Sequence, residues 1–166
     1  RLFTIGIEKV AVNAAAVGDM NLVTQAARVF GSQSIVVGID VRRSRFGRYE
    51  RHVRSATVGT KETAVEAAVR AEAAGAGELM LTSVDRDGTQ QGYDLTLVQE
   101  VASAVKVPVI ACGGAGSTAH MAQVIKQGHA ASAAAGSLFV FQGKHRAVLI
   151  TYPDEKEIDA ALAALN

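Results

Sequence analysis

Short apolar runs with strand character alternate with longer runs of helical spacing, and this alternation constrains the fold more than any other feature of the chain. We expect strands over 9–13, 35–40, 78–83, 108–112 and 131–137, and helices over 22–30, 63–74, 95–105, 118–127 and 154–165. A repeated strand–helix order predicts a parallel sheet with right-handed crossovers. The run over 35–40 is apolar on both faces, as buried parallel strands are. The sequence therefore predicts an α/β fold.

Each predicted strand ends in a polar or glycine-rich segment. These ends are Asn13, Asp40, 85–89, 113–116 and 136–137. In a parallel sheet such ends gather at the C-terminal face, where α/β proteins build their sites. Five strand–helix units are too few for a complete (β/α)8 barrel, which typically has about 250 residues. An open doubly wound sheet and part of a barrel are both compatible with this number.

The composition excludes several classes of protein. With 49% hydrophobic and 20% charged residues the chain is globular, and we expect a single domain over residues 1–166. A net charge of +1 argues against binding to nucleic acid. One cysteine cannot form an internal disulfide, and the histidines share no metal-ligand spacing, so no metal or other cofactor is expected. No apolar run reaches the roughly 18 residues that span a membrane, and no signal peptide is recognisable, so we expect a soluble, cytoplasmic protein.

The segment Gly113-Gly114-Ala115-Gly116-Ser117 lies between a predicted buried strand and a predicted helix. Backbone amides at a helix N-terminus bind phosphate oxygens, and glycine lets a ligand approach the backbone closely. The alternative is a tight turn that requires glycine for its own conformation. Gly136 and Ser137 end the next predicted strand, and two adjacent glycine-rich strand ends resemble the phosphate site of barrels. We therefore expect a phosphorylated small-molecule substrate here.

Acidic residues at two strand ends are candidates for catalysis or binding. Asp40 follows the most apolar strand, where burial would raise the pKa of a carboxyl group and suit it to acid–base chemistry. Alternatively, Asp40 caps a helix or pairs with Arg42 or Arg43. In the segment after the next predicted strand, Asp87 and Gly88 either belong to a self-paired turn or bind the hydroxyl and phosphate groups of a substrate.

A basic segment lies between residues 42 and 61, with the cations Arg42, Arg43, Arg45, Arg48, Arg51, Arg54 and Lys61. Within it, Phe46-Gly47-Arg48-Tyr49 is typical of a hairpin turn. We interpret this basic segment first as a solvated surface hairpin, then as a contact for a phosphorylated substrate, and last as a contact for nucleic acid. Cys112 lies within a predicted strand and is interpreted as a buried small residue rather than a nucleophile.

Five motifs occur in an order and spacing typical of a known family, namely 8–13, 30–40, 75–78, 85–94 and 113–116. With them the chain resembles the HisF family, the cyclase subunit of imidazole glycerol phosphate synthase. The resemblance implies an incomplete TIM (β/α)8 barrel that covers about strands 4–8, without the first three βα units. It implies a lyase of histidine biosynthesis that forms imidazole glycerol phosphate and aminoimidazole carboxamide ribonucleotide. It also implies a HisH-like glutaminase partner that supplies ammonia.

The same resemblance implies roles for particular residues. Asp40 corresponds to the fifth-strand member of two catalytic aspartates that act as acid and base. The phosphate-binding and substrate-binding positions are Asn13, Thr82, Asp87, Gly88, Gly113, Gly114, Gly136 and Ser137. Glu8 corresponds to an acid of the glutaminase interface, and Lys9 and Glu78 correspond to charges of the gate through which ammonia enters.

The chain also departs from the family pattern. The first catalytic aspartate belongs to strands that are absent here, so half of the acid–base pair is expected to be missing. Ala14 stands where a phosphate-binding Thr is usual, and His129 where a Gly usually precedes the last strand. The tail, 135–141 and 143–153, is similar to a HisF-like paralogue associated with amidation of surface-polysaccharide sugars.

Three functions are therefore left open. In the first, the chain belongs to a HisF-class cyclase, either as the intact enzyme or as a fragment of it. Such a fragment is not expected to be active alone. Or it is a non-catalytic module that binds a glutaminase and passes ammonia to a sugar-amidating enzyme. Or it is a truncated product without activity. Asp40 and the glycine-rich strand ends favour the first function, whereas the tail favours the pathway of the second.

Overall fold

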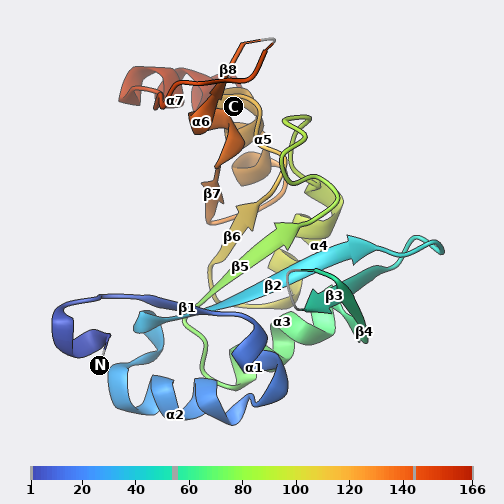
Figure 1. The fold of residues 1–166 in the computed structure, drawn as a ribbon, viewed down its shortest axis with the longest axis vertical. Coiled ribbons are helices and arrows are strands. Elements are labelled where there is room, and N and C mark those ends of the chain that lie inside the picture. Colours follow the sequence, from blue (N-terminus) through green and yellow to red (C-terminus); the bar gives the residue numbers. More distant parts are fainter. Residues whose placement is uncertain (1, 54–55, 144, 166) are drawn as a thin grey trace.

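The main sheet of this computed structural model is built on parallel strands, as the sequence predicts. Within the described residues, 2–53, 56–143 and 145–165, five parallel strands follow one another in the spatial order β1 (Val10–Val12), β2 (Ile35–Arg43), β5 (Glu78–Ser83), β6 (Val109–Cys112) and β7 (Ser132–Ala134) (Figure 1). Arg54 of the basic segment and Lys144 of the tail lie outside those ranges. The α/β prediction is confirmed.

A β-hairpin extends β2 beyond its parallel neighbours. β2 pairs with β1 over its first residues and, from Asp40 onward, with the antiparallel strand β3 (Tyr49–Val53), which pairs in turn with β4 (Val58–Thr63). The turn between β2 and β3 contains Gly47, whose φ of +83° favours glycine. The hairpin predicted at residues 46–49 is thus confirmed. β4 has no counterpart among the predicted strands because its sequence, VGTKET, shows little apolar alternation.

Capping side chains define where the main helices begin. Thr63 forms a reciprocal capping box with Glu66 at the start of α3, and the Asp94 side chain accepts a hydrogen bond from the first turn of α4. None of the helices in the described ranges is long and apolar enough to cross a bilayer. Their bounds are η1 Phe3–Ile5, α1 Ala14–Gly18, α2 Asn21–Phe30, η2 Ser32–Ser34, α3 Ala64–Ala73, α4 Leu95–Ala104, α5 Thr118–Lys126, α6 Ser137–Val140 and α7 Glu155–Ala163.

The last part of the chain corrects one prediction. The strand expected over 131–137 is only three residues long, and Ser137 instead begins the short helix α6. Alanine, serine and glycine dominate this run, and they lack the β-branched or aromatic side chains that favour strands. A small second sheet follows, in which β8 (Phe141–Gln142) pairs with β9 (Ala147–Val148). We call this pair the tail hairpin.

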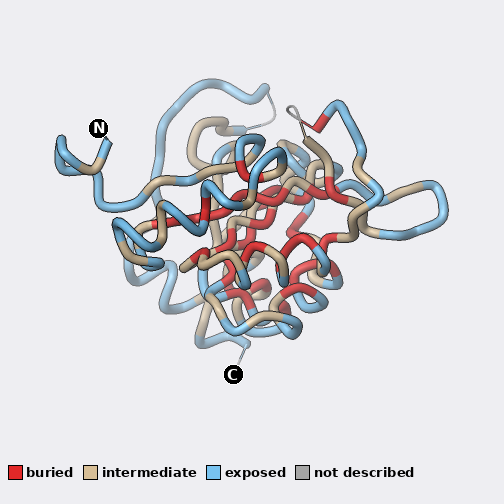
Figure 2. Tube along the Cα trace, turned by 90° about the horizontal axis from the view of Figure 1, so that it is seen from below, coloured by how far each residue is buried: buried red, intermediate tan, exposed pale blue. Residues whose placement is uncertain are grey.

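Alternate residues along the strands face opposite sides of the sheet. On one side Val37, Ile39, Leu79 and Leu81 are buried in an apolar cluster with residues of α2 to α5, such as Val23. Figure 2 shows these buried segments at the centre of the molecule, with exposed segments around them. The other side carries a row of partly buried residues at the C-terminal end of the strands, level with one another in register: Asp40, Thr82, Cys112 and Ala134.

Candidate functional site

Three loops that are far apart in the sequence line one cavity of about 190 Å³ at the C-terminal end of the sheet. Its walls are residues 87–88 after β5, 112–115 at the end of β6, and 134–137 after β7. A β-carbon placed on Gly88 would lie 3.9 Å from the Ser137 hydroxyl, so two of the loops approach each other closely. The cavity walls include six predicted phosphate residues: Asp87, Gly88, Gly113, Gly114, Gly136 and Ser137.

The backbone itself requires glycine at two of these positions. Gly113 has a φ of +90°, and a β-carbon there would lie 2.5 Å from the Ser83 carbonyl oxygen. Gly114 has a φ of +106°, and a β-carbon there would lie 2.2 Å from the carbonyl oxygen of Gly92. The Gly92 amide in turn donates a 2.7 Å hydrogen bond to the Gly114 carbonyl. The tight turn and the cavity wall are therefore the same feature.

Asp40 lies within β2, near the level where β5 and β6 end, and β2 is two strands away from β6 in the cavity wall. It is level with Thr82 of β5, which is level with Cys112 in the cavity wall. Neighbouring strands are about 4.8 Å apart, so the backbones at Asp40 and Cys112 are roughly 10 Å apart. That spacing suits a small molecule whose phosphate occupies the cavity while its reacting end meets Asp40.

Asn13, which follows β1, contacts Asp40 directly. Its Nδ2 donates a 2.9 Å hydrogen bond to Asp40 Oδ2. The other amide atom, Asn13 Oδ1, is buried and has no hydrogen-bond partner among the described residues. A carbonyl oxygen in that state can accept a hydrogen bond from a ligand. Asn13 lies on the β1 side of β2, so it does not join the cavity residues.

The two alternatives for Asp40 are not realised. Asp40 lies within a strand and caps no helix. The Arg43 amide donates a 2.8 Å hydrogen bond to Asp85 Oδ2, and Arg42 Nε lies 4.0 Å from Asp85 Oδ1. Among the described residues, neither arginine forms an ion pair with Asp40. The carboxylate therefore keeps an oxygen available for chemistry.

Thr82 and Cys112 link Asp40 to the cavity. Burial raises the pKa of the Cys112 thiol, and a hydrogen bond with the Thr82 side chain opposes that rise. A raised pKa leaves the thiol protonated, which agrees with the prediction that Cys112 is not a nucleophile. The side chain is only partly buried, however, because it faces the cavity.

Charged residues also meet at the opposite, N-terminal end of the strands. Lys9 precedes β1 and Glu78 begins β5, so the two lie on either side of the first residues of β2. Lys9 Nζ forms a salt bridge with Glu78 Oε1. Glu8 is exposed beside Lys9. The structure thus brings two of the three predicted gate and interface residues into direct contact.

Comparison with known proteins identifies the family. A sequence model described as "Histidine biosynthesis protein" matches residues 1–146. The chain belongs to this histidine biosynthesis family. The α/β fold with its parallel sheet is consistent with a partial (β/α)8 barrel of this family, as expected.

Three HisF relatives illustrate the similarity. Two are named "Putative imidazole glycerol phosphate synthase subunit": hisF2 of Pseudomonas aeruginosa, 48% identical over 96% of this chain and 63% of its own length, and hisF3 of Vibrio vulnificus, 39% identical over 98% and 63%. The "Imidazole glycerol phosphate synthase subunit HisF" of Alkaliphilus metalliredigens is 47% identical over 81% of this chain and 53% of its own. The chain thus spans between half and two thirds of the length of these relatives.

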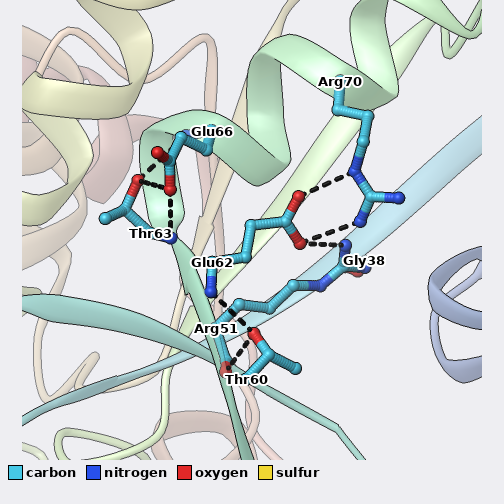
Figure 3. A network of polar contacts seen from close by, with 7 residues as sticks. All are labelled: Gly38, Arg51, Thr60, Glu62, Thr63, Glu66 and Arg70. Atoms are coloured by element: carbon cyan, nitrogen blue, oxygen red, sulfur yellow. Dashed lines mark hydrogen bonds and ion pairs between the residues drawn. The ribbon is translucent and has the colours of Figure 1, made fainter.

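Arg51 of this HisF-family chain takes part in a network of charged side chains that no sequence pattern predicts (Figure 3). The side chain of Arg51 is completely buried, so the interpretation of the basic segment as solvated is wrong at this residue. Its Nη1 lies 3.3 Å from Glu62 Oε2, and its Nη2 donates to the Gly38 carbonyl at 3.5 Å. Glu62 also accepts hydrogen bonds of 2.7 and 2.8 Å from Arg70. We call Arg51, Glu62 and Arg70 the buried charge network.

The buried charge network is explained by strand pairing. Gly38 lies between the last residue that pairs with β1, Val37, and the first that pairs with β3, Asp40. The Gly38 carbonyl therefore has no strand partner on the edge of β2 that faces β1 and β3, and Arg51 supplies the missing hydrogen-bond donor. Burial lowers the pKa of Arg51, and the hydrogen bond to Glu62 opposes that change. The three charges are separated by 11 and 8 residues, which is no local pattern.

The described residues contain no group of three or more His, Cys, Asp or Glu side chains placed to hold a metal ion.

Proposed function

We propose that this chain supplies the phosphate-binding loops and one acid–base aspartate of a HisF-type cyclase, the subunit that forms imidazole glycerol phosphate with ammonia. The observation that carries the proposal is the convergence of the loops after β5, β6 and β7 on one cavity, level with Asp40. None of these loops is adjacent to another in the sequence, so a cavity made from all three is a feature of this fold and not of a local turn.

We expect the cavity to offer the hydrogen-bond donors that a phosphate group needs. Its walls are rich in glycine, so a ligand can approach backbone amides without obstruction from side chains. The Ser137 hydroxyl adds a side-chain donor beside Gly88. These groups bind a phosphorylated small molecule through hydrogen bonds to its oxygens.

Asp40 is the group that moves protons in this proposal. Its carboxylate would accept a proton from the reacting nitrogen and return one during ring closure. Asn13 holds one carboxylate oxygen through its amide, which fixes the orientation of the group. Thr82, level with Asp40 and Cys112, lines the path between the reacting end and the phosphate.

Ammonia is proposed to come from a HisH-type glutaminase subunit. The relatives are named as subunits of a synthase, which supports a partner of this kind. Lys9 and Glu78 lie at the end of the strands opposite to Asp40, and Glu8 is exposed beside them. A salt bridge there can exclude water and open for a small neutral molecule, and Glu8 would contact the partner.

The first experiment is a titration of the purified chain with inorganic phosphate, followed by the amide signals in two-dimensional NMR spectra. We expect the largest shifts at 87–88, 113–114 and 136–137, and small ones at Lys9 and Glu78. An absence of binding, or shifts spread evenly over the basic segment, would contradict the proposed phosphate site.

A second candidate is kept because the relatives include subunits numbered hisF2 and hisF3 beside HisF itself. In this candidate the chain binds a glutaminase and passes ammonia to an enzyme that amidates a surface-polysaccharide sugar. Retained glutaminase binding without ammonia-dependent cyclisation of the imidazole precursor would favour it.

A further inference from the structure

The tail hairpin carries an arginine to the edge of the proposed phosphate cavity. Arg146 Nη1 donates a hydrogen bond of 3.4 Å to the carbonyl oxygen of Gly88, which lines that cavity. The guanidinium also lies over the ring of Phe141, 4.7 Å from its centre. Two contacts from different parts of the chain thus hold the Arg146 side chain beside the cavity.

The charge of the cavity wall gives this arginine its importance. The residues that line the cavity include one carboxylate, Asp87, and no lysine or arginine. A phosphate group carries up to two negative charges, so within these walls it meets donors but no countercharge. The exposed guanidinium of Arg146, beside Gly88, is placed to provide this countercharge. The five hydrogen-bond donors of a guanidinium lie in one plane and match the oxygens of a phosphate group.

The backbone at Arg146 is unusual as well. Its φ is +50°, a conformation that residues with side chains seldom adopt. The amide of Arg146 donates a 3.0 Å hydrogen bond to the Gly143 carbonyl, which closes the turn of the tail hairpin. The second strand of this hairpin, Ala147–Val148, follows the last residue that the family model matches. This turn places the Arg146 cation beside Gly88.

We propose that Arg146 is a substrate-binding residue of this chain, whose guanidinium contacts the phosphate of the ligand at the Gly88 side of the cavity. The inference rests on the proposed phosphate site and adds a residue to it. Of its five donors, one is used by Gly88, and the others face no partner among the described residues. Arg146 thus gives the ligand a countercharge from the tail, outside the three loops.

The test is the affinity of the purified chain for inorganic phosphate, measured by calorimetry at constant ionic strength. We expect Arg146→Gln to weaken binding about tenfold, the usual effect of losing one charge-assisted hydrogen bond at an exposed site. Arg146→Lys keeps the charge without the planar fork, so we expect an intermediate loss. Arg45→Gln is the matched control, because it removes an equal charge from the exposed β2–β3 turn; we expect a change below about twofold.

Two results would overturn the inference, and they differ in what else they affect. If Arg146→Gln and Arg45→Gln bind phosphate equally, Arg146 has no part in binding, while the cavity proposal stands. If the parent chain does not bind phosphate at all, the phosphate site and the role of Arg146 both fail. Circular dichroism of each variant checks the fold, which an exposed side chain is not expected to change.

Discussion

The Asn13 side-chain amide donates a 2.9 Å hydrogen bond to the carboxylate of Asp40, although the two residues are 27 positions apart, with α1 and α2 between them. The contact joins the residue after β1 to Asp40 within β2, at the point where β2 stops pairing with β1 and begins to pair with β3. Gly38 makes room for it, since a β-carbon there would lie 3.2 Å from Asn13 Cβ. Asp40 is thus oriented by a neighbour that no local pattern would assign to it.

The first prediction concerns this pair. We expect Asp40→Asn to lower ammonia-dependent cyclisation at least about 100-fold, because the variant cannot take up the proton. Asn13→Ala should lower turnover about tenfold by freeing the carboxylate to rotate. Neither should change the affinity for inorganic phosphate, since the cavity is two strands away. Turnover is measured with ammonium chloride in a HisF-type cyclase that contains this chain's residues and both catalytic aspartates, and a fully active Asp40→Asn variant would refute the acid–base role.

The second prediction separates two glycines of the cavity. Gly114→Val should abolish phosphate binding and cost about 1–3 kcal/mol of stability, because φ is +106° and Gly92 blocks the space for a side chain. Gly136→Ala meets no atom within 4 Å and should change stability by less than about 0.5 kcal/mol. Urea unfolding and phosphate titration of both variants check this. Unimpaired phosphate binding by Gly114→Val would count against the site.

The third prediction concerns the buried charge network. Glu62→Gln leaves the fully buried Arg51 without a countercharge, and we expect a loss of about 3 kcal/mol in the free energy of unfolding. Arg70→Gln removes a partner of Glu62 that is 41% exposed, and we expect a loss of about 1 kcal/mol or less. Urea unfolding of the two variants side by side measures the difference. Equal losses would mean that Arg51 does not depend on Glu62.

The fourth prediction is a pH dependence that arises at Tyr49. Burial and the 2.9 Å hydrogen bond that its hydroxyl donates to Asp94 raise the pKa of Tyr49 from 10.0 to about 12. Because the folded state holds this proton more tightly than the unfolded state, its stabilising effect is complete below pH 10 and is lost as the pH rises towards 12.

The variant Tyr49→Phe lacks this proton and isolates its effect. We expect the stability of the parent to fall more steeply than that of Tyr49→Phe between pH 10 and pH 12. Thermal unfolding at several pH values measures the two slopes, and absorbance at the tyrosinate band follows the titration itself. Identical slopes would show that Tyr49 titrates as an unperturbed tyrosine.

The fifth prediction concerns the salt bridge at the N-terminal end of the strands. Lys9 is half exposed, so Lys9→Met should cost less than about 1 kcal/mol of stability. In the presence of the glutaminase, we expect this variant to lose more of the glutamine-dependent turnover than of the turnover with added ammonium chloride. The ratio of the two rates is the measurement, and an unchanged ratio would remove Lys9 from the path of ammonia.

Much of the fold was readable from local patterns. The alternation of apolar runs predicted each parallel strand near its observed position, because side-chain periodicity reports which residues must be buried. The helices expected from residues 63 and 95 begin at Ala64 and Leu95, where the side chains of Thr63 and Asp94 cap them. The strand at 131–137 was overestimated, since alanine, serine and glycine lack the side chains that favour strands.

The candidate site was predictable only in its parts. Gly113, Gly114 and Asp40 were recognisable as residues at strand ends, where parallel sheets place their sites. Sequence spacing alone could not show that the loops after β5, β6 and β7 enclose one cavity, or that Arg146 reaches Gly88. Such contacts depend on strand order and register, which long-range packing decides.

The sequence by itself determined the fold class, the order of the elements and the residue types at the strand ends, because propensity and periodicity act over a few neighbouring residues. The tertiary structure alone decided which of these residues meet. It buried Arg51 within a segment that reads as a solvated hairpin, and it turned Asn13 towards Asp40. Both outcomes arise where β2 stops pairing with β1 and begins to pair with β3. Pairing between strands that are distant in the sequence determines which backbone and side-chain groups need hydrogen-bond partners.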